Sequence, residues 1–229
     1  MKLIIAGIGP GKNELITLEA VNFARSSDII IVPRSKQNKQ GIAEAVIINH
    51  LPERKLLPIY FPMIKNEIER SKIIHEQLIN SKSEWQNAKN IFFPVIGDVA
   101  LYSTGAYLLE EMRKIIPDLS IKFLPGISAH SLAASCAKRF LAMNDEIFAI
   151  IPGTANPEKI IQALKAANSA AIYKPSAIKN IHAIINPDEY KILRVDFAGI
   201  PELEKIISGS KALENLNQYL SILLLWKNF

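Results

Sequence analysis

Short apolar runs rich in β-branched residues alternate along the whole chain with segments that have the apolar spacing of helices. Such runs are typical of buried strands, and their alternation with helices predicts an α/β fold. We expect strands at residues 3–6, 29–32, 91–95, 120–124, 147–151, 170–173, 191–195 and 221–226. We expect helices at residues 14–26 with Asn13 as N-cap, and at 42–49, 66–85, 106–115, 128–140 and 157–167.

The best candidate for a domain boundary is Ile116-Pro117-Asp118, where a predicted helix ends and a strand begins. It predicts two α/β domains, at residues 1–117 and 118–229. The sequence shows no internal repeat and no long linker between the halves, so we expect the two domains to pack closely. Small-molecule sites usually lie in clefts, so a site between the domains is expected.

Composition narrows the class of protein. No apolar run approaches the ~20 residues of a membrane span, and the N-terminal run is too short for a signal peptide. The only cysteine, Cys136, is expected to be a packing residue rather than a nucleophile, and a single thiol suits a reducing compartment. The four histidines lack metal-ligand spacing, so no metal site is predicted. These features favour a cytoplasmic protein that needs no membrane.

The net charge of +5 is compatible with an anionic partner. The positive charges are spread along the chain, and their one local concentration is Arg34, Lys36 and Lys39. Aromatic residues make up only 7% and do not interleave with basic ones, which argues against nucleic acid. The basic segment is therefore either a solvated surface or a site for an anionic small molecule.

The stretch Gly7-Ile8-Gly9-Pro10-Gly11 closes the first strand and precedes a helix, an arrangement that brings backbone close to a ligand. It is not the dinucleotide fingerprint, because Lys12 stands where the third glycine belongs and Pro10 removes an N–H donor. Asp28 does stand about where a ribose-binding acid would be, which leaves a nucleotide site as a minor alternative.

Two further loops follow strands and precede helices. In residues 95–104, Gly97 allows a ligand to approach, and Asp98 either caps the next helix or accepts hydrogen bonds from a ligand. In residues 124–129, Ser128 is a candidate N-cap. The free N–H groups of such a helix N-terminus favour an anionic group.

Taken in order, Gly-Ile-Gly-Pro-Gly, Ile-Gly-Asp followed by Tyr102, and Pro-Gly-Ile-Ser-Ala resemble the tetrapyrrole (corrin/porphyrin) methylase family. The resemblance covers essentially the whole chain. It implies a two-domain α/β protein, typically a homodimer, that binds S-adenosylmethionine in the cleft between its domains and transfers the methyl group to an anionic tetrapyrrole.

Within the family, the segment Val32-Pro33-Arg34-Ser35-Lys36 is similar to that of members that methylate carbon 20 of precorrin-2 or cobalt-precorrin-2. The stretches 198–202 and 218–224 resemble the same subgroup. Precorrins carry several carboxylates, and arginine binds carboxylates in a bidentate manner. The resemblance therefore implies that Arg34, and next Lys36, bind the substrate. The alternatives are another branch of the family, acting on a different corrin position or on uroporphyrinogen III, and a non-catalytic homologue.

The resemblance also implies a set of contacts to the cofactor. They are Pro10 in the first loop, Gly97, Asp98 and Leu101 in the second, Ser128 and Ala129 in the third, and Tyr173 and Ala198 further along. Val99 stands where relatives usually have proline, and Tyr173 where many have methionine. The activated methyl donor and the electron-rich carbon need mainly alignment. A base must also take the proton from the methylated carbon, and because nothing in the sequence identifies that base, no residue is assigned as catalytic.

Overall fold

The computed structural model describes residues 1–200, 202–218 and 220–228, and it divides into two compact units, Met1–Ser128 and Ala129–Phe229. Pro201 and Tyr219, which belong to two of the motifs above, lie outside the described residues. The boundary follows Ser128 rather than Pro117, because β5 (Ser120–Leu124) pairs with β1 (Lys2–Gly7) and so belongs to the first unit. No helix of the described residues is long and apolar enough to cross a membrane.

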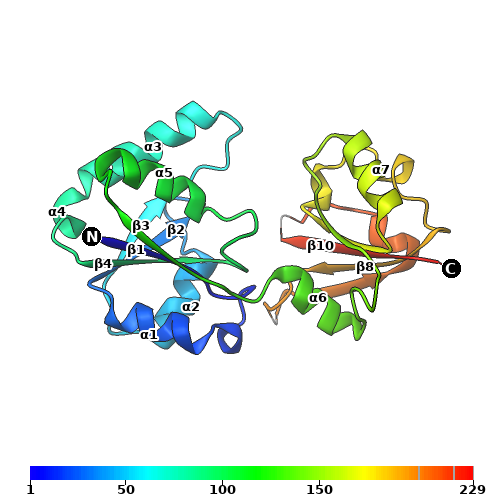
Figure 1. The fold of residues 1–229 in the computed structure, drawn as a ribbon, viewed down its shortest axis with the longest axis horizontal. Coiled ribbons are helices and arrows are strands. Elements are labelled where there is room, and N and C mark those ends of the chain that lie inside the picture. The colour runs from blue at the N-terminus through cyan, green and yellow to red at the C-terminus, as the bar shows by residue number, and fades with distance from the viewer. Residues whose placement is uncertain (201, 219, 229) are drawn as a thin grey trace. The chain divides into compact units, whose positions relative to one another are not determined.

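The first unit contains a parallel five-stranded sheet with the strand order β3-β2-β4-β1-β5 (Figure 1). The other three strands of this sheet are β2 (Ile29–Arg34), β3 (Leu56–Tyr60) and β4 (Asn90–Val95). A parallel sheet must be covered on both faces, which explains why β1 and β4 are buried along nearly their whole length.

Alternate residues of β1 face different helices. Leu3 and Ile5 pack in one cluster with α3 (Glu67–Asn80), α4 (Lys82–Trp85) and α5 (Gly105–Ile115). Ile4 and Ala6 pack in another with α1 (Leu18–Ser26) and α2 (Ile42–His50). Figure 1 shows these two helix groups on opposite faces of the sheet. The unit is therefore a doubly wound α/β fold.

The second unit contains a mixed sheet with the order β6-β7-β10-β8-β9. Its strands are β6 (Phe148–Pro152), β7 (Ser169–Tyr173), β8 (Tyr190–Asp196), β9 (Lys205–Ser208) and β10 (Ser221–Lys227), of which only β6 and β7 pair in parallel. α6 (Ala129–Ala137) covers one face through Ala133 and Ala134, and α7 (Pro157–Ala166) covers the other through Ile160 and Leu164. The short helices η2 (Pro175–Ala177), η3 (Ile181–Ala183) and η4 (Gly209–Leu213) complete the second unit.

The fold confirms the predicted α/β class, and each predicted strand is present within two residues at either end. The first helix begins later than expected. Residues 13–15 form the short helix η1 (Asn13–Leu15), and Thr17 rather than Asn13 caps α1 by accepting a hydrogen bond from the Ala20 N–H at 3.2 Å. The predicted helix at 66–85 is divided at Ser81 into α3 and α4.

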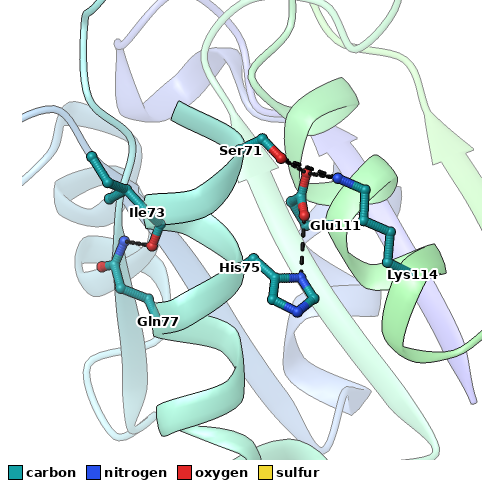
Figure 2. Close-up of polar contacts among 6 residues, drawn as sticks. All are labelled: Ser71, Ile73, His75, Gln77, Glu111 and Lys114. Carbon is teal, nitrogen blue, oxygen red and sulfur yellow. Dashed lines mark hydrogen bonds and ion pairs between the residues drawn. The ribbon is translucent and has the colours of Figure 1, made fainter. Parts of the chain in front are cut away.

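A buried carboxylate fastens α3 to α5 (Figure 2). Glu111 on α5 is only 2% exposed and accepts hydrogen bonds from Ser71 Oγ at 2.7 Å and Lys114 Nζ at 2.6 Å. Its second oxygen lies 3.2 Å from His75 Nδ1. Burial alone would raise the pKa of Glu111, but the hydrogen bonds from Lys114 and Ser71, with the Lys114 charge, hold it below its ordinary value. The cluster therefore stabilises the helix pair in its charged form.

We expect Glu111→Gln to lower the free energy of unfolding at pH 7 by about 1–3 kcal/mol, because the buried acceptors are replaced in part by a donor. Since the folded pKa of Glu111 is depressed, its stabilisation is present at neutral pH and is lost as the pH falls through that pKa. Urea titrations at pH 7 and in the acid range measure both effects. The matched control is the exposed neighbour Glu110→Gln, and an equal loss in both variants would contradict the assignment.

Candidate functional site

Three glycine loops meet where β4, β1 and β5 end. These strands are neighbours in the sheet, so their carboxyl ends lie side by side. A Cβ atom added to Gly7 would lie 2.7 Å from both Gly97 O and Gly126 N, and one added to Gly126 would lie 2.4 Å from Gly97 O. Backbone therefore contacts backbone at all three loops, and no side chain fits between them.

The first two loops are also hydrogen-bonded to each other. Gly97 N donates to Gly9 O at 2.8 Å, and Gly9 N donates to Gly97 O at 3.2 Å. After β1 the chain continues to α1 on one face of the sheet, whereas after β4 it continues to α5 on the other face. Such a divergence between neighbouring strands is the topological switch point at which open α/β sheets bind their ligands.

Asp98 joins the second loop to the third. Its Oδ2 accepts the Gly126 N–H at 2.9 Å, and its Oδ1 accepts the Ala100 N–H at 2.9 Å. The prediction that Asp98 caps the next helix is wrong, because α5 begins only at Gly105 with Thr104 at the N-cap position. Instead the carboxylate fixes the relative position of two loops, and the alternative that it also accepts a hydrogen bond from a ligand stays a prediction.

The space beside Gly97 suits a ligand. Gly97 has φ +79°, and a Cβ built there would meet no atom within 4 Å. Pro10 is buried, Leu101 is half-buried, and Ser128 is buried directly before the first residue of α6. Five of the predicted cofactor residues thus lie in the three loops of the first unit, and open space beside a glycine backbone fits the close approach of S-adenosylmethionine. Val99, at the proline position of relatives, packs in the core.

The other three predicted cofactor residues lie together in the second unit. Ala129 on α6, Tyr173 at the end of β7 and Ala198 just after β8 pack in one hydrophobic cluster. Tyr173 OH lies 2.8 Å from His130 Nδ1. His130 is a polar neighbour of this group that its sequence context did not single out, because neither metal-ligand spacing nor a motif marks it.

Arg34 is the last residue of β2, and Lys36 stands two residues further along the chain. Arg34 is paired with Glu44 of α2, through Nε to Oε2 at 2.7 Å and NH2 to Oε1 at 2.5 Å. The hydrogen bond to Glu44 is the main reason that the pKa of Arg34 is raised, and the hydrogen bond from Arg34 likewise lowers the pKa of Glu44. Lys36 is exposed, as is Lys39. The basic segment thus combines one paired arginine with two solvated lysines.

The alternative that Asp28 is the ribose-binding acid of a nucleotide site is wrong. Its Oδ2 accepts the N–H groups of Lys89 and Asn90 at 2.8 and 2.7 Å, where β2 and β4 begin. The three glycine loops lie at the opposite ends of these strands. Asp28 therefore joins two strand starts and is too far along the sheet to serve a ligand at the loops.

A cavity of about 650 Å³ lies elsewhere, in the second unit. Its lining includes Ser169, Lys191 and Trp226, which lie where β7 and β8 begin and β10 ends. Tyr173 and Ala198 lie at the opposite ends of β7 and β8. The position of the cavity does not coincide with any predicted site residue.

Two other kinds of reactive site that a sequence can indicate are a nucleophilic cysteine and a metal centre. Burial, followed by the nearby charge of Glu204, raises the pKa of the Cys136 thiol, which makes it a poor nucleophile at neutral pH. Among the described residues no cluster of three or more histidine, cysteine or acidic side chains could hold a metal ion.

We expect Gly126→Ala to lower the free energy of unfolding by about 3 kcal/mol, because the added methyl group would overlap backbone of two other loops. The control is Gly209→Ala, at φ +68° with nothing within 4 Å of the added carbon, which should cost about 1 kcal/mol from backbone strain alone. Denaturant titration compares the two. A loss at Gly126 no larger than that at Gly209 would disprove the close contact of the loops.

The sequence resembles a known protein family along most of its length. Residues 2–212 match the family model described as Tetrapyrrole (Corrin/Porphyrin) Methylases. The chain is 28% identical over 174 residues to the cobalt-precorrin-2 C(20)-methyltransferase of Salmonella typhimurium, covering 76% of this chain and 72% of that one. It is also 28% identical over 225 residues to a Methanocaldococcus jannaschii protein named "Probable cobalt-precorrin-2 C(20)-methyltransferase", covering 96% and 94%.

Solved structures share the fold. Cobalt precorrin-4 methyltransferase superposes with a TM-score of 0.69 at 20% identity, over 98% of this chain and 94% of that one. A uroporphyrin-III C-methyl transferase from Thermus thermophilus, complexed with S-adenyl homocysteine, superposes with a TM-score of 0.67 at 17% identity, over 99% and 97%. With three glycine loops at the switch point of its first sheet, and the family match along nearly its whole length, this chain belongs to the tetrapyrrole (corrin/porphyrin) methylases.

Proposed function

We propose that the protein transfers a methyl group from S-adenosylmethionine to carbon 20 of precorrin-2, or of its cobalt complex, in cobalamin biosynthesis. The observation that carries this proposal is the meeting of the three glycine loops at the ends of β4, β1 and β5, with open space beside Gly97. The curated relatives named as C(20)-methyltransferases support the choice of substrate.

When bound, S-adenosylmethionine supplies a methyl group on a sulfonium, whose leaving group is already activated. The task of the protein is then to orient donor and acceptor, and this is a form of catalysis that rigid loops can provide. The proposed contacts from the first unit are the backbone of Gly97 and the fixed carboxylate of Asp98, together with Pro10, Leu101 and Ser128. Ala129, Tyr173 and Ala198 are the proposed contacts from the second unit.

The basic segment at the end of β2 is proposed to bind the carboxylates of the tetrapyrrole. The side chain of Arg34 is 25% exposed, and Lys36, two residues further along the chain, is exposed. A fixed guanidinium recognises carboxylates by shape as well as by charge, whereas a lysine acts mainly as a point charge.

We also propose that the protein works as a homodimer in the cytoplasm. The single cysteine suits a reducing compartment, and homodimers are typical of the family. Analytical ultracentrifugation of the purified chain tests the oligomeric state.

The direct test is an anaerobic incubation with labelled S-adenosylmethionine that compares precorrin-2 with cobalt-precorrin-2 and reads the product mass. We expect one methyl group to be added to at least one of them, and the preferred substrate shows whether cobalt is inserted first. Transfer only to uroporphyrinogen III or to another corrin would assign the protein to another branch. Binding of the cofactor without any transfer would indicate a non-catalytic homologue.

The cofactor position is tested by Gly97→Ala. The added methyl group would fill the open space beside the loop, so we expect the dissociation constant for S-adenosylmethionine to rise by roughly tenfold or more. Gly209→Ala is a closely matched control, because its glycine also has positive φ and open surroundings. Calorimetric titration of both variants measures the difference, and equal affinities would place the cofactor away from Gly97.

A further inference from the structure

Arg34 is held by a partner that lies outside every motif in the sequence. Glu44 is 5% exposed, and both of its oxygens bind the guanidinium, at 2.7 Å to Nε and 2.5 Å to NH2. Glu44 Oε2 also accepts the Gly41 N–H at 3.2 Å. A buried carboxylate with three donors is fixed in place, and so is the guanidinium that it binds.

The pairing uses only one edge of the guanidinium. Nε and NH2 face Glu44, while NH1 has a long contact of 3.5 Å to Gln37 O. The side chain of Arg34 remains 25% exposed, against 6% for that of Glu44. NH1 is therefore the nitrogen best placed to donate to a carboxylate from outside.

The helix that carries Glu44 also contacts the glycine loops. Ala43 and Val46 of α2 pack with Ile8 in the first loop and Ile96 in the second. The start of α2 lies against the end of β2, because a Cβ on Gly41 would lie 2.5 Å from Pro33 O. One rigid helix thus connects Arg34 to the loops proposed to hold the cofactor.

We propose that Glu44 is a positioning residue, which orients Arg34 so that its NH1 edge meets a carboxylate of the tetrapyrrole at a fixed place relative to the glycine loops. This inference rests on the proposed function. It assigns to Glu44 a role in substrate recognition although its side chain does not reach the substrate.

Charge and orientation predict opposite effects for Glu44→Gln. The substitution removes a negative charge close to a site for a polyanion, so electrostatic attraction alone would lower KM for the tetrapyrrole. If Glu44 orients Arg34, KM rises despite the added net positive charge, because the amide cannot bind both nitrogens. We expect KM for the tetrapyrrole to rise roughly tenfold, with kcat and KM for S-adenosylmethionine nearly unchanged.

The control is Glu84→Gln, which removes the same charge from an exposed pair with Lys55 at 3.2 Å. It should leave all three constants unchanged. Arg34→Lys keeps the positive charge without the planar guanidinium and should raise KM as Glu44→Gln does. The double variant should lose no more than either single one, because both remove the same interaction. An unchanged or lower KM in Glu44→Gln, or additive losses, would overturn the proposal.

A readout that needs no activity separates this inference from the proposed function. In the wild type, the Arg34 Nε–H should give a slowly exchanging side-chain NMR signal, which Glu44→Gln should abolish. Absence of that signal in the wild type would overturn the positioning role, whatever the enzyme methylates. Failure of the wild type to methylate any tetrapyrrole, with the signal present, would reject the proposed function and with it the role in substrate binding.

Discussion

The backbone contact among Gly7, Gly97 and Gly126 is the constraint on which the first unit depends. Side chains at Gly7 and Gly126 would separate the loops, so their approach requires glycine at these two positions, whereas Gly97 contributes its carbonyl oxygen to the contact. It also requires β4, β1 and β5 to be neighbours, which brings together segments far apart in the sequence. Once the loops are joined, the divergence of α1 and α5 to opposite faces leaves the open space beside Gly97. The place of the proposed ligand site therefore follows from the topology of the sheet.

Local patterns predict much of this fold, because buried strands and glycine turns are marked by their own residues. The strands that the patterns missed lie at sheet edges. β3 contains the exposed Pro58, which lacks an N–H donor and is tolerated there because β3 pairs on one side only. β9 is short and partly exposed at the edge of the second sheet. The apolar run of β3 is interrupted by Pro58, and β9 has only four residues, so neither gives a clear local pattern.

Long-range contacts explain the remaining differences. Pro117 ends a helix, which is a local event, whereas the pairing of β5 with β1 decides to which unit residues 120–124 belong. Asp98 resembles a helix cap in sequence, but its partner Gly126 stands in another loop. Glu44 resembles any acidic residue near the start of a helix. Only its burial against Arg34 distinguishes it, and neither burial nor that partner can be read from the spacing alone.

The basic segment that is proposed to bind the substrate contains two kinds of cation. Exposed lysines such as Lys36 and Lys39 attract a polyanion over a distance, but salt screens that attraction within about 10 Å. Arg34 adds little net charge, because Glu44 neutralises it, and yet its orientation is fixed by two short hydrogen bonds. A neutralised but oriented guanidinium selects for the position of a carboxylate rather than for charge. Since Arg34 is proposed to bind one carboxylate of the tetrapyrrole at a fixed position, its orientation contributes more to that binding than another free positive charge would.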